Sequence, residues 1–200
     1  MSYSLSLYLV DLAKANGAIG GGDDKLRRMI GGRFKSQLAH ADEEFSSLIE
    51  DGAPTRYDAV RAVIEGGPYD EAHAFQYAYA YEMICQFYGR RLFNNHFSPY
   101  RSGWLETVDK GLSDLGIKAV SVTDFTYGSV PSALPAPEHL PCYGEWSPDQ
   151  CAEALTQWES TTQEQRDSLD HEVLEAIDYC IEWTREAQTR PGCGVAAFEF

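Results

Sequence analysis

The chain has 200 residues and a formal net charge of −15, and 44% of its residues are hydrophobic. This length and apolar content exclude general disorder and predict one domain over residues 1–200. Its 31 acids against 16 bases argue against a protein that binds nucleic acid through the phosphates.

The sequence predicts a cytoplasmic protein that does not span a membrane. It contains no uninterrupted apolar run of 18 residues. The first residues alternate apolar and polar side chains, unlike the solid apolar block of a secretory signal. The five cysteines are an odd set without a C-x-x-C pair, which favours reduced thiols: Cys85, Cys142, Cys151, Cys180 and Cys193.

The N-terminal third predicts one strand and two helices. Residues 2–10 alternate with a period of two, which is typical of a half-buried strand. Asp23 is a suitable N-cap for a short helix that we expect to end at Gly31. Residues 33–50 place apolar side chains every three or four positions, which predicts a second, amphipathic helix.

The next two predicted helices differ in character. Thr55 and Asp58 form a capping-box pattern that opens a helix, and 66–68 (Gly-Gly-Pro) ends it. Residues 69–88 carry apolar and aromatic side chains on every side of a helical wheel. A helix of that kind belongs in the interior, so we expect 69–88 to lie at the centre of the core.

In the middle of the chain, residues 94–102 predict a loop and 103–115 a helix. Residues 117–125 contain several β-branched side chains, which favours a strand. Five prolines between positions 131 and 148 indicate a long irregular segment.

The C-terminal part predicts two helices and a closing strand. Ser147 followed by proline and, three residues on, by glutamine is a strong helix start. We expect one continuous helix over 163–188 and a strand over 194–200 beside the first strand. The predicted fold is therefore α+β, mostly helical, with a small sheet from N-terminal, middle and C-terminal strands.

Acidic side chains are concentrated near the C-terminus, where residues 138–188 hold thirteen acids against two arginines. On one continuous helix, seven polar side chains would fall within about one third of the circumference. We call these residues the acidic stripe: Glu164, Asp167, His171, Glu175, Asp178, Glu182 and Glu186.

Three interpretations of the acidic stripe are open. Charge runs are most often simply a solvated helix face. Alternatively, acids concentrated on one face form a docking surface that speeds association with a basic protein. A metal site at His171, Glu175 and Asp178 is the weakest interpretation, because one helix would supply every ligand.

The predicted central helix offers a candidate ligand pocket. A buried Glu82 must be paired or have a raised pKa, and perturbed acids often mark active sites, although pairing with tyrosine or arginine is commoner. Several buried tyrosines imply a polar network or a wet pocket. The candidate pocket residues are His73, Tyr77, Tyr81 and Glu82 on this helix, with Arg101 from the predicted loop 94–102 and Trp104 from the predicted helix 103–115.

The aromatic loop before Trp104, residues 95–101, has the composition of an interface hot spot, but it equally suits a loop folded over the core. No phosphate-binding loop, dinucleotide fingerprint, zinc-protease or nucleophile-elbow motif occurs in the sequence. We therefore assign no catalytic residue, metal or cofactor, and an enzyme is the less favoured class.

Three segments stand out together: SYSLSLYLVDL, FQYAYAYEMICQFYG and FSPYRSGWLETVD. With the residues between them, to about residue 145, they resemble a family of uncharacterised bacterial proteins related to the YfbM-like group. That resemblance implies a cytoplasmic α+β domain of unknown function and supplies no catalytic residues. Some families of this sort accompany secreted toxins as immunity proteins, which fits the acidic stripe.

The sequence thus predicts an acidic cytoplasmic protein that sequesters a basic protein partner, such as a toxin, by occluding it. The alternative is an enzyme or small-molecule carrier whose pocket lies on the helix 69–88.

Overall fold

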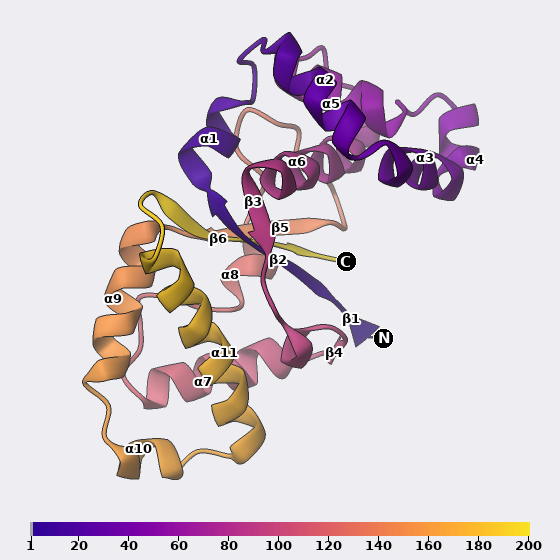
Figure 1. The fold of residues 1–200 in the computed structure, drawn as a ribbon. Helices are drawn as coiled ribbons and strands as arrows, with labels where there is room; N and C mark the ends of the chain where they lie inside the picture. Colours follow the sequence, from indigo (N-terminus) through magenta and orange to yellow (C-terminus); the bar gives the residue numbers. More distant parts are fainter. Residues whose placement is uncertain (1) are drawn as a thin grey trace.

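A four-stranded antiparallel sheet lies between two layers of helices in the computed structural model, which describes residues 2–200 (Figure 1). Its strand order is β3-β2-β6-β5. The fold is α+β and mostly helical, as predicted. The strands are β2 (Leu5–Asp11), β3 (Gly89–Arg91), β5 (Cys142–Trp146) and β6 (Cys193–Glu199).

The first strand is central, and both of its faces are buried. β2 pairs with β6 from Leu5↔Glu199 to Asp11↔Cys193, which confirms that the two ends of the chain meet in the sheet. The strand expected near the N-terminus is confirmed, but its expected half-burial is wrong, because Tyr8 and Val10 are buried on the face opposite Leu5. The alternation of β2 therefore divides the core into two hydrophobic clusters, one on each side of the sheet.

One helical layer comes from the first half of the chain. Asp23 caps its second helix, accepting a hydrogen bond from the Leu26 N–H (3.0 Å). That helix continues through Gly31 instead of ending there, and the expected helix 33–50 is interrupted at Phe45. The helices of this layer are α1 (Leu12–Gly17), α2 (Asp24–Arg33), α3 (Lys35–Glu44), α4 (Ser46–Glu50), α5 (Arg56–Glu65) and α6 (Ala74–Tyr88), which follows a 3-10 turn, η1 (Glu71–His73).

The central position of α6 is confirmed. It packs against α5, α1 and β2, and Tyr81 at its middle is fully buried with its ring edge-on to Tyr143 of β5. The apolar side chains that surround this helix are matched by protein on almost every side, because the sheet and the N-terminal helices enclose it.

The second layer comes mainly from the C-terminal half. It encloses a core that includes two fully buried tryptophans, Trp146 and Trp183. The predicted capping box at Ser147 and Gln150 is confirmed. The helices of this layer are α7 (Trp104–Asp114), α9 (Pro148–Glu159), α10 (Gln163–Asp167) and α11 (His171–Gln188).

The strand expected over 117–125 is wrong. The carboxylate of Asp109 on α7 accepts hydrogen bonds from the backbone N–H groups of Val122 (2.7 Å) and Thr123 (3.1 Å), so these groups are not available to a sheet. The chain turns there into a short helix, α8 (Asp124–Tyr127). The strand that this part of the chain contributes lies instead at β5, an edge strand inside the proline-containing segment.

The expected loop 94–102 contains a 3-10 turn, η2 (Asn95–Phe97), and a two-residue strand, β4 (Tyr100–Arg101), that pairs with β1 (Ser2–Tyr3). Phe97 is fully buried and Tyr100 is 7% exposed. The loop is therefore folded over the core, which was one of its two interpretations.

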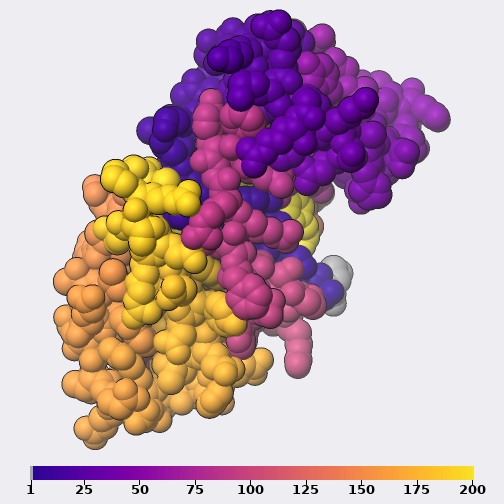
Figure 2. All heavy atoms as spheres, viewed as in Figure 1, coloured from indigo at the N-terminus to yellow at the C-terminus, as the bar shows by residue number. Residues whose placement is uncertain are grey.

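The continuous helix expected over 163–188 is also wrong, because the chain leaves the helix after Asp167. The Asp170 carboxylate accepts hydrogen bonds from the N–H groups of Glu172 (2.9 Å) and Val173 (3.4 Å), and so begins α11 as a separate helix. Figure 2 shows the N-terminal helices at one end of the molecule and this C-terminal region at the other. No helix within residues 2–200 combines the length and apolarity that crossing a bilayer requires.

Candidate functional site

The structure does not bring the acidic stripe together as one surface. Glu164 and Asp167 lie on α10, and the break at residues 168–170 separates them from the outer face of α11. The other five members lie on α11, where all except the half-buried Glu186 are exposed: His171, Glu175, Asp178, Glu182 and Glu186.

Cations of the same chain already pair with part of the acidic stripe. Arg90 of β3 forms an ion pair with Glu186, and Arg185 lies 3.3 Å from Glu182. Glu175 has two histidine neighbours, His96 and His171. The stripe is therefore less anionic than its sequence suggests, and negative charge alone does not distinguish it.

A cluster of aromatic side chains lies against α11 among these acids. Phe93 is 60% exposed, and its ring centroid is 5.4 Å from that of Tyr179. The centroid of the His96 ring lies 5.0 Å from that of Tyr179. The indole N–H of the buried Trp183 donates a hydrogen bond to the Phe93 carbonyl (2.8 Å), which fixes the backbone beneath the exposed ring.

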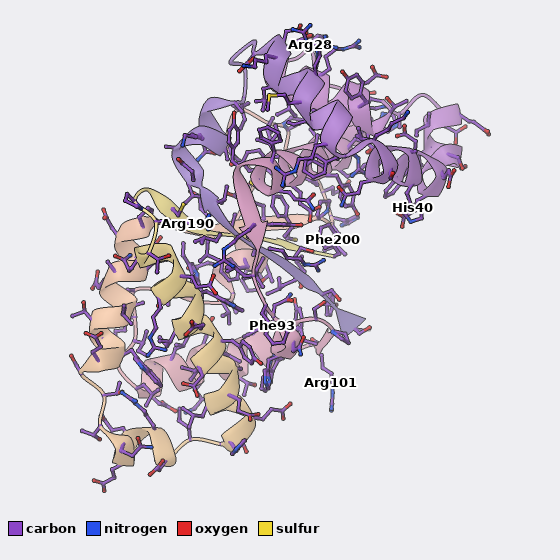
Figure 3. All side chains as sticks on the ribbon, viewed as in Figure 1. Arg28, His40, Phe93, Arg101, Arg190 and Phe200 are labelled. Carbon is purple, nitrogen blue, oxygen red and sulfur yellow. The ribbon has the colours of Figure 1, made fainter. Side chains whose placement is uncertain are left out.

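We call the surface formed by Phe93, His96, Glu175, Tyr179 and Glu182 the α11 face. Glu175 and Glu182 flank Tyr179 along the helix, four residues before it and three after it. The Glu175 carboxylate lies 3.9 Å from the His96 Nε2 atom and 3.6 Å from the Nδ1 atom of His171. Figure 3 shows Phe93 beside α11, in the segment between β3 and η2.

Sequence analysis missed Phe93 and Tyr179 as candidate site residues. Tyr179 could have been found, because it lies between Glu175 and Glu182 at helical spacing. Phe93 carries no such signal, since only the fold brings residue 93 beside residue 179.

Among the exposed acids of α11, Asp178 has a shifted pKa. Partial burial raises the pKa of this carboxyl group, and the nearby Glu175 acts in the same direction. Arg166 and Arg185 oppose these effects. Its side chain still lies on the exposed outer face of α11.

The candidate pocket on α6 is not formed by the residues proposed for it. The Tyr77 hydroxyl accepts a hydrogen bond from the Asp70 N–H (2.8 Å), and the ring of His73 lies 2.8 Å from the Asp70 carboxylate. The Tyr81 hydroxyl donates to the side chain of Asn16 (2.6 Å). Interactions within the chain thus occupy these groups, and none of them lines either of the two main cavities.

Glu82, the third candidate residue on α6, has the partner that burial requires. Its carboxylate accepts a hydrogen bond from the Tyr8 hydroxyl (2.8 Å). Burial raises the pKa of Glu82, while Tyr8, Arg56 and Arg91 act in the opposite direction. The expected pairing with a tyrosine is confirmed, and the buried Arg56 is a neighbour that sequence analysis did not identify.

Arg56 is held in the core by aromatic and amide groups. Its guanidinium lies 4.2 Å from the centre of the Tyr79 ring, and its Nε–H donates to Gln76 (2.9 Å). Burial lowers the pKa of Arg56 to about 10. This buried polar group connects α5 to α6 and does not line either main cavity.

Arg101 and Trp104 lie on the other side of the sheet from the α6 residues. Both line a cavity of about 530 Å³ together with His96 and Glu172. The Trp104 indole N–H donates to the His96 carbonyl (2.8 Å), while the Arg101 side chain extends away from the body of the protein (Figure 3). The six candidate pocket residues therefore do not form one site.

A larger cavity of about 720 Å³ opens between α1, α8, β5 and the loop after α8. Asn16, Asp124, Tyr143 and Glu145 are among its polar lining residues. Sequence analysis did not identify this site, because its walls come from segments more than 100 residues apart.

Within residues 2–200, no three His, Cys, Asp or Glu side chains form a group suited to a metal ion. The metal interpretation of His171, Glu175 and Asp178 therefore has no support from the geometry. All five cysteines are free thiols in the structure.

Comparison with known proteins identifies one family. The model of a domain of unknown function, DUF7691, matches residues 1–199. No curated protein and no solved structure matches the chain.

Proposed function

The chain belongs to DUF7691, a family of unknown function, and from the geometry alone we propose that it is a binding protein for a basic protein partner. The docking surface in this proposal is the α11 face. It replaces the longer acidic stripe, whose α10 residues lie beyond the break at 168–170.

The observation that carries the proposal is the exposed ring of Phe93, 60% accessible, which packs beside Tyr179 on a helix that also presents Glu175 and Glu182. Large aromatic side chains at the centre of an interface supply much of its binding energy once they are desolvated. The Trp183 hydrogen bond to the Phe93 carbonyl fixes the backbone that carries this ring before any partner arrives, which reduces the ordering that binding requires.

Charge supports a basic partner over a neutral one. The whole chain carries −15, and residues 138–188, which include α11, hold thirteen acids against two arginines. Such a field accelerates the approach of a positively charged protein, and salt weakens it. Glu175 and Glu182 would then meet lysine or arginine side chains around an apolar group seated on Phe93 and Tyr179.

The proposed mechanism is occlusion: the partner's basic surface is covered and cannot reach its own target. An immunity protein that holds a toxin inactive acts in this way, and that is the partner class we favour. A distant link to the YfbM-like group, a bacterial origin and a cytoplasmic location, where free thiols stay reduced, belong to the same proposal.

The test selects random peptides displayed on phage against the immobilised protein, with counter-selection on the Phe93→Ala variant. We expect enriched peptides to combine lysine or arginine with a large apolar residue. A synthesised peptide should bind about tenfold more weakly to Phe93→Ala and to Glu182→Lys. Its affinity should also fall between about 0.05 M and about 0.3 M salt.

The matched control is Glu159→Lys, which makes the same change in net charge at an exposed position on α9. It should leave binding nearly unchanged. Enriched peptides without basic residues, or equal weakening by Glu159→Lys and Glu182→Lys, would overturn the proposal.

One observation favours a second candidate function, the binding of a small molecule. The cavity beside β5 has a volume typical of ligand sites. If the protein is a carrier, we place its pocket there and not on α6.

A further inference from the structure

Two elements that line the larger cavity, α8 and β5, are tightly packed against each other. At Gly144 of β5, an added Cβ would lie 2.1 Å from the Asp124 carbonyl oxygen, and at Gly128 it would lie 2.4 Å from the Tyr143 carbonyl oxygen. Glycine is needed at both positions because β5 and the end of α8 are in direct backbone contact. The cavity of about 720 Å³ therefore opens beside two tightly packed elements.

The charged side chains that line this cavity are both acidic. Asp124 comes from α8 and Glu145 from β5, and the lining includes no lysine, arginine or histidine. Among residues 2–200, no cationic side chain lies within 4.0 Å of either carboxylate. This differs from the α11 face, where Glu175 has histidine neighbours and Glu182 has an arginine.

The inner wall contains a buried polar pair. Tyr143 is 3% exposed, and its hydroxyl donates a hydrogen bond to the Glu145 carboxylate. Behind it, Tyr81 of α6 donates to Asn16, another lining residue. Glu145 is thereby oriented by the core, and its remaining acceptor positions are available to a donor in the cavity.

Asp124 adds a second negative charge to the cavity, and no cationic side chain pairs with it among residues 2–200. Partial burial and then the neighbouring Asp109 carboxylate raise the pKa of Asp124, and only a backbone hydrogen bond from Ser121 opposes them. A cation in the cavity would favour the ionised carboxylate by direct attraction.

An aromatic ring stands at the cavity as well. Tyr127 lines it and is 78% exposed. Its hydroxyl lies 3.4 Å from Glu106 of α7. The faces of tyrosine rings attract organic cations, and the effect grows when water is excluded.

From this combination we propose that the cavity binds a small organic cation, an amine or guanidinium compound. Glu145 and Asp124 supply the negative charge, and Tyr143 orients Glu145. Tyr127 covers the apolar part of the ligand. The site is separate from the α11 face, so the two proposals can fail independently.

The experiment measures binding to the full chain by isothermal titration calorimetry, with 1,4-diaminobutane and methylguanidinium as cationic probes. The neutral analogue 1,4-butanediol tests the role of charge, and MgCl₂ tests for a site that attracts any cation. We expect saturable binding of at least one organic cation, and none of the diol or of Mg²⁺.

Glu145→Gln and Asp124→Asn should each weaken this binding about tenfold or more. Glu145→Gln keeps an acceptor for the Tyr143 hydroxyl, so the fold should be retained, and circular dichroism checks this. The matched control is Glu138→Gln, an exposed acid on the nearby loop that does not line the cavity.

Three results would overturn the proposal. The first is the absence of saturable binding by either organic cation. The second is equal binding of Mg²⁺ or the diol, and the third is equal weakening by Glu138→Gln and Glu145→Gln.

Discussion

The helices α6 and α11 both carried candidate sites in the sequence, but the fold treats their polar groups differently. On α6, the Tyr81 and Glu82 side chains find partners on α1 and β2. On α11, Tyr179 meets an exposed ring, and Glu182 faces solvent. Tyrosines and acids at helical spacing therefore indicate function only when the rest of the chain leaves them accessible.

The largest expected effect is on stability, at the α6 side of this comparison. Tyr81→Ala removes a fully buried ring and should lower the free energy of unfolding by about 3–5 kcal/mol. Urea denaturation measures this. Phe93→Ala, which truncates the exposed ring near α11, is the matched control and should change stability by about 0.5 kcal/mol or less. A similar loss of unfolding free energy in the two variants would contradict the conclusion that Tyr81 stabilises the core whereas Phe93 does not.

The next prediction concerns the break that separates α10 from α11. Asp170→Ala removes the cap at the start of α11 and should cost about 1 kcal/mol. Asp167→Ala removes the same charge from α10 without removing a cap, and should cost clearly less. Thermal unfolding at neutral pH compares the stability of the two variants. An equal loss of stability would show that the cap is not what stabilises the start of α11.

The Glu82 carboxyl group on α6 makes the free energy of unfolding depend on pH. Burial raises the pKa of Glu82 above its ordinary value of 4.5. The folded state then keeps this proton to a higher pH than the unfolded state, so Glu82 lowers stability as the pH rises from 4.5 through the raised pKa. Glu82→Gln keeps an acceptor for the Tyr8 hydroxyl and avoids the buried charge.

We therefore expect Glu82→Gln to be more stable than the wild type at pH 7, by about 1 kcal/mol, and to lose less stability over that pH window. Urea denaturation across the window measures both quantities. The exposed Glu50→Gln provides the control. A variant less stable than the wild type at pH 7 would mean that the charged form of Glu82 is favoured in the folded protein.

The smallest effect on stability is expected at α11, where an ion pair can be broken without disturbing the core. Arg90→Ala breaks the ion pair with Glu186 at the surface, so the free energy of unfolding should change by about 0.5 kcal/mol or less. Binding of a selected basic peptide should tighten about twofold, because one repelling charge is gone. Arg28→Ala, at an exposed position on α2, is the control. Equal tightening in both variants would mean that total charge, not the α11 face, determines affinity.

Local patterns in the sequence predicted several features correctly. The caps at Asp23 and Ser147 were predicted, because each depends on residues within one helical turn. The interior position of α6 follows from its apolar side chains on every side. The two terminal strands also follow from their own apolar patterns, and they pair as expected.

Other features depend on contacts that local patterns do not contain. The β-branched residues near position 120 favoured a strand, but the Asp109 carboxylate bonds to their backbone. The Asp170 cap interrupts a helix that the spacing of acids made continuous. In both places a side-chain carboxylate took up backbone N–H groups, which overrode the pattern.

Short stretches of the chain predict an acidic α+β domain, most of its helices and the burial of α6, because apolar patterns and caps are encoded within a few residues. Which polar groups remain exposed depends on contacts between segments far apart in the chain. Phe93 meets Tyr179 across 86 positions, and the larger cavity joins α1 to β5. Accessibility depends on what packs against each side chain, and distant segments supply that packing.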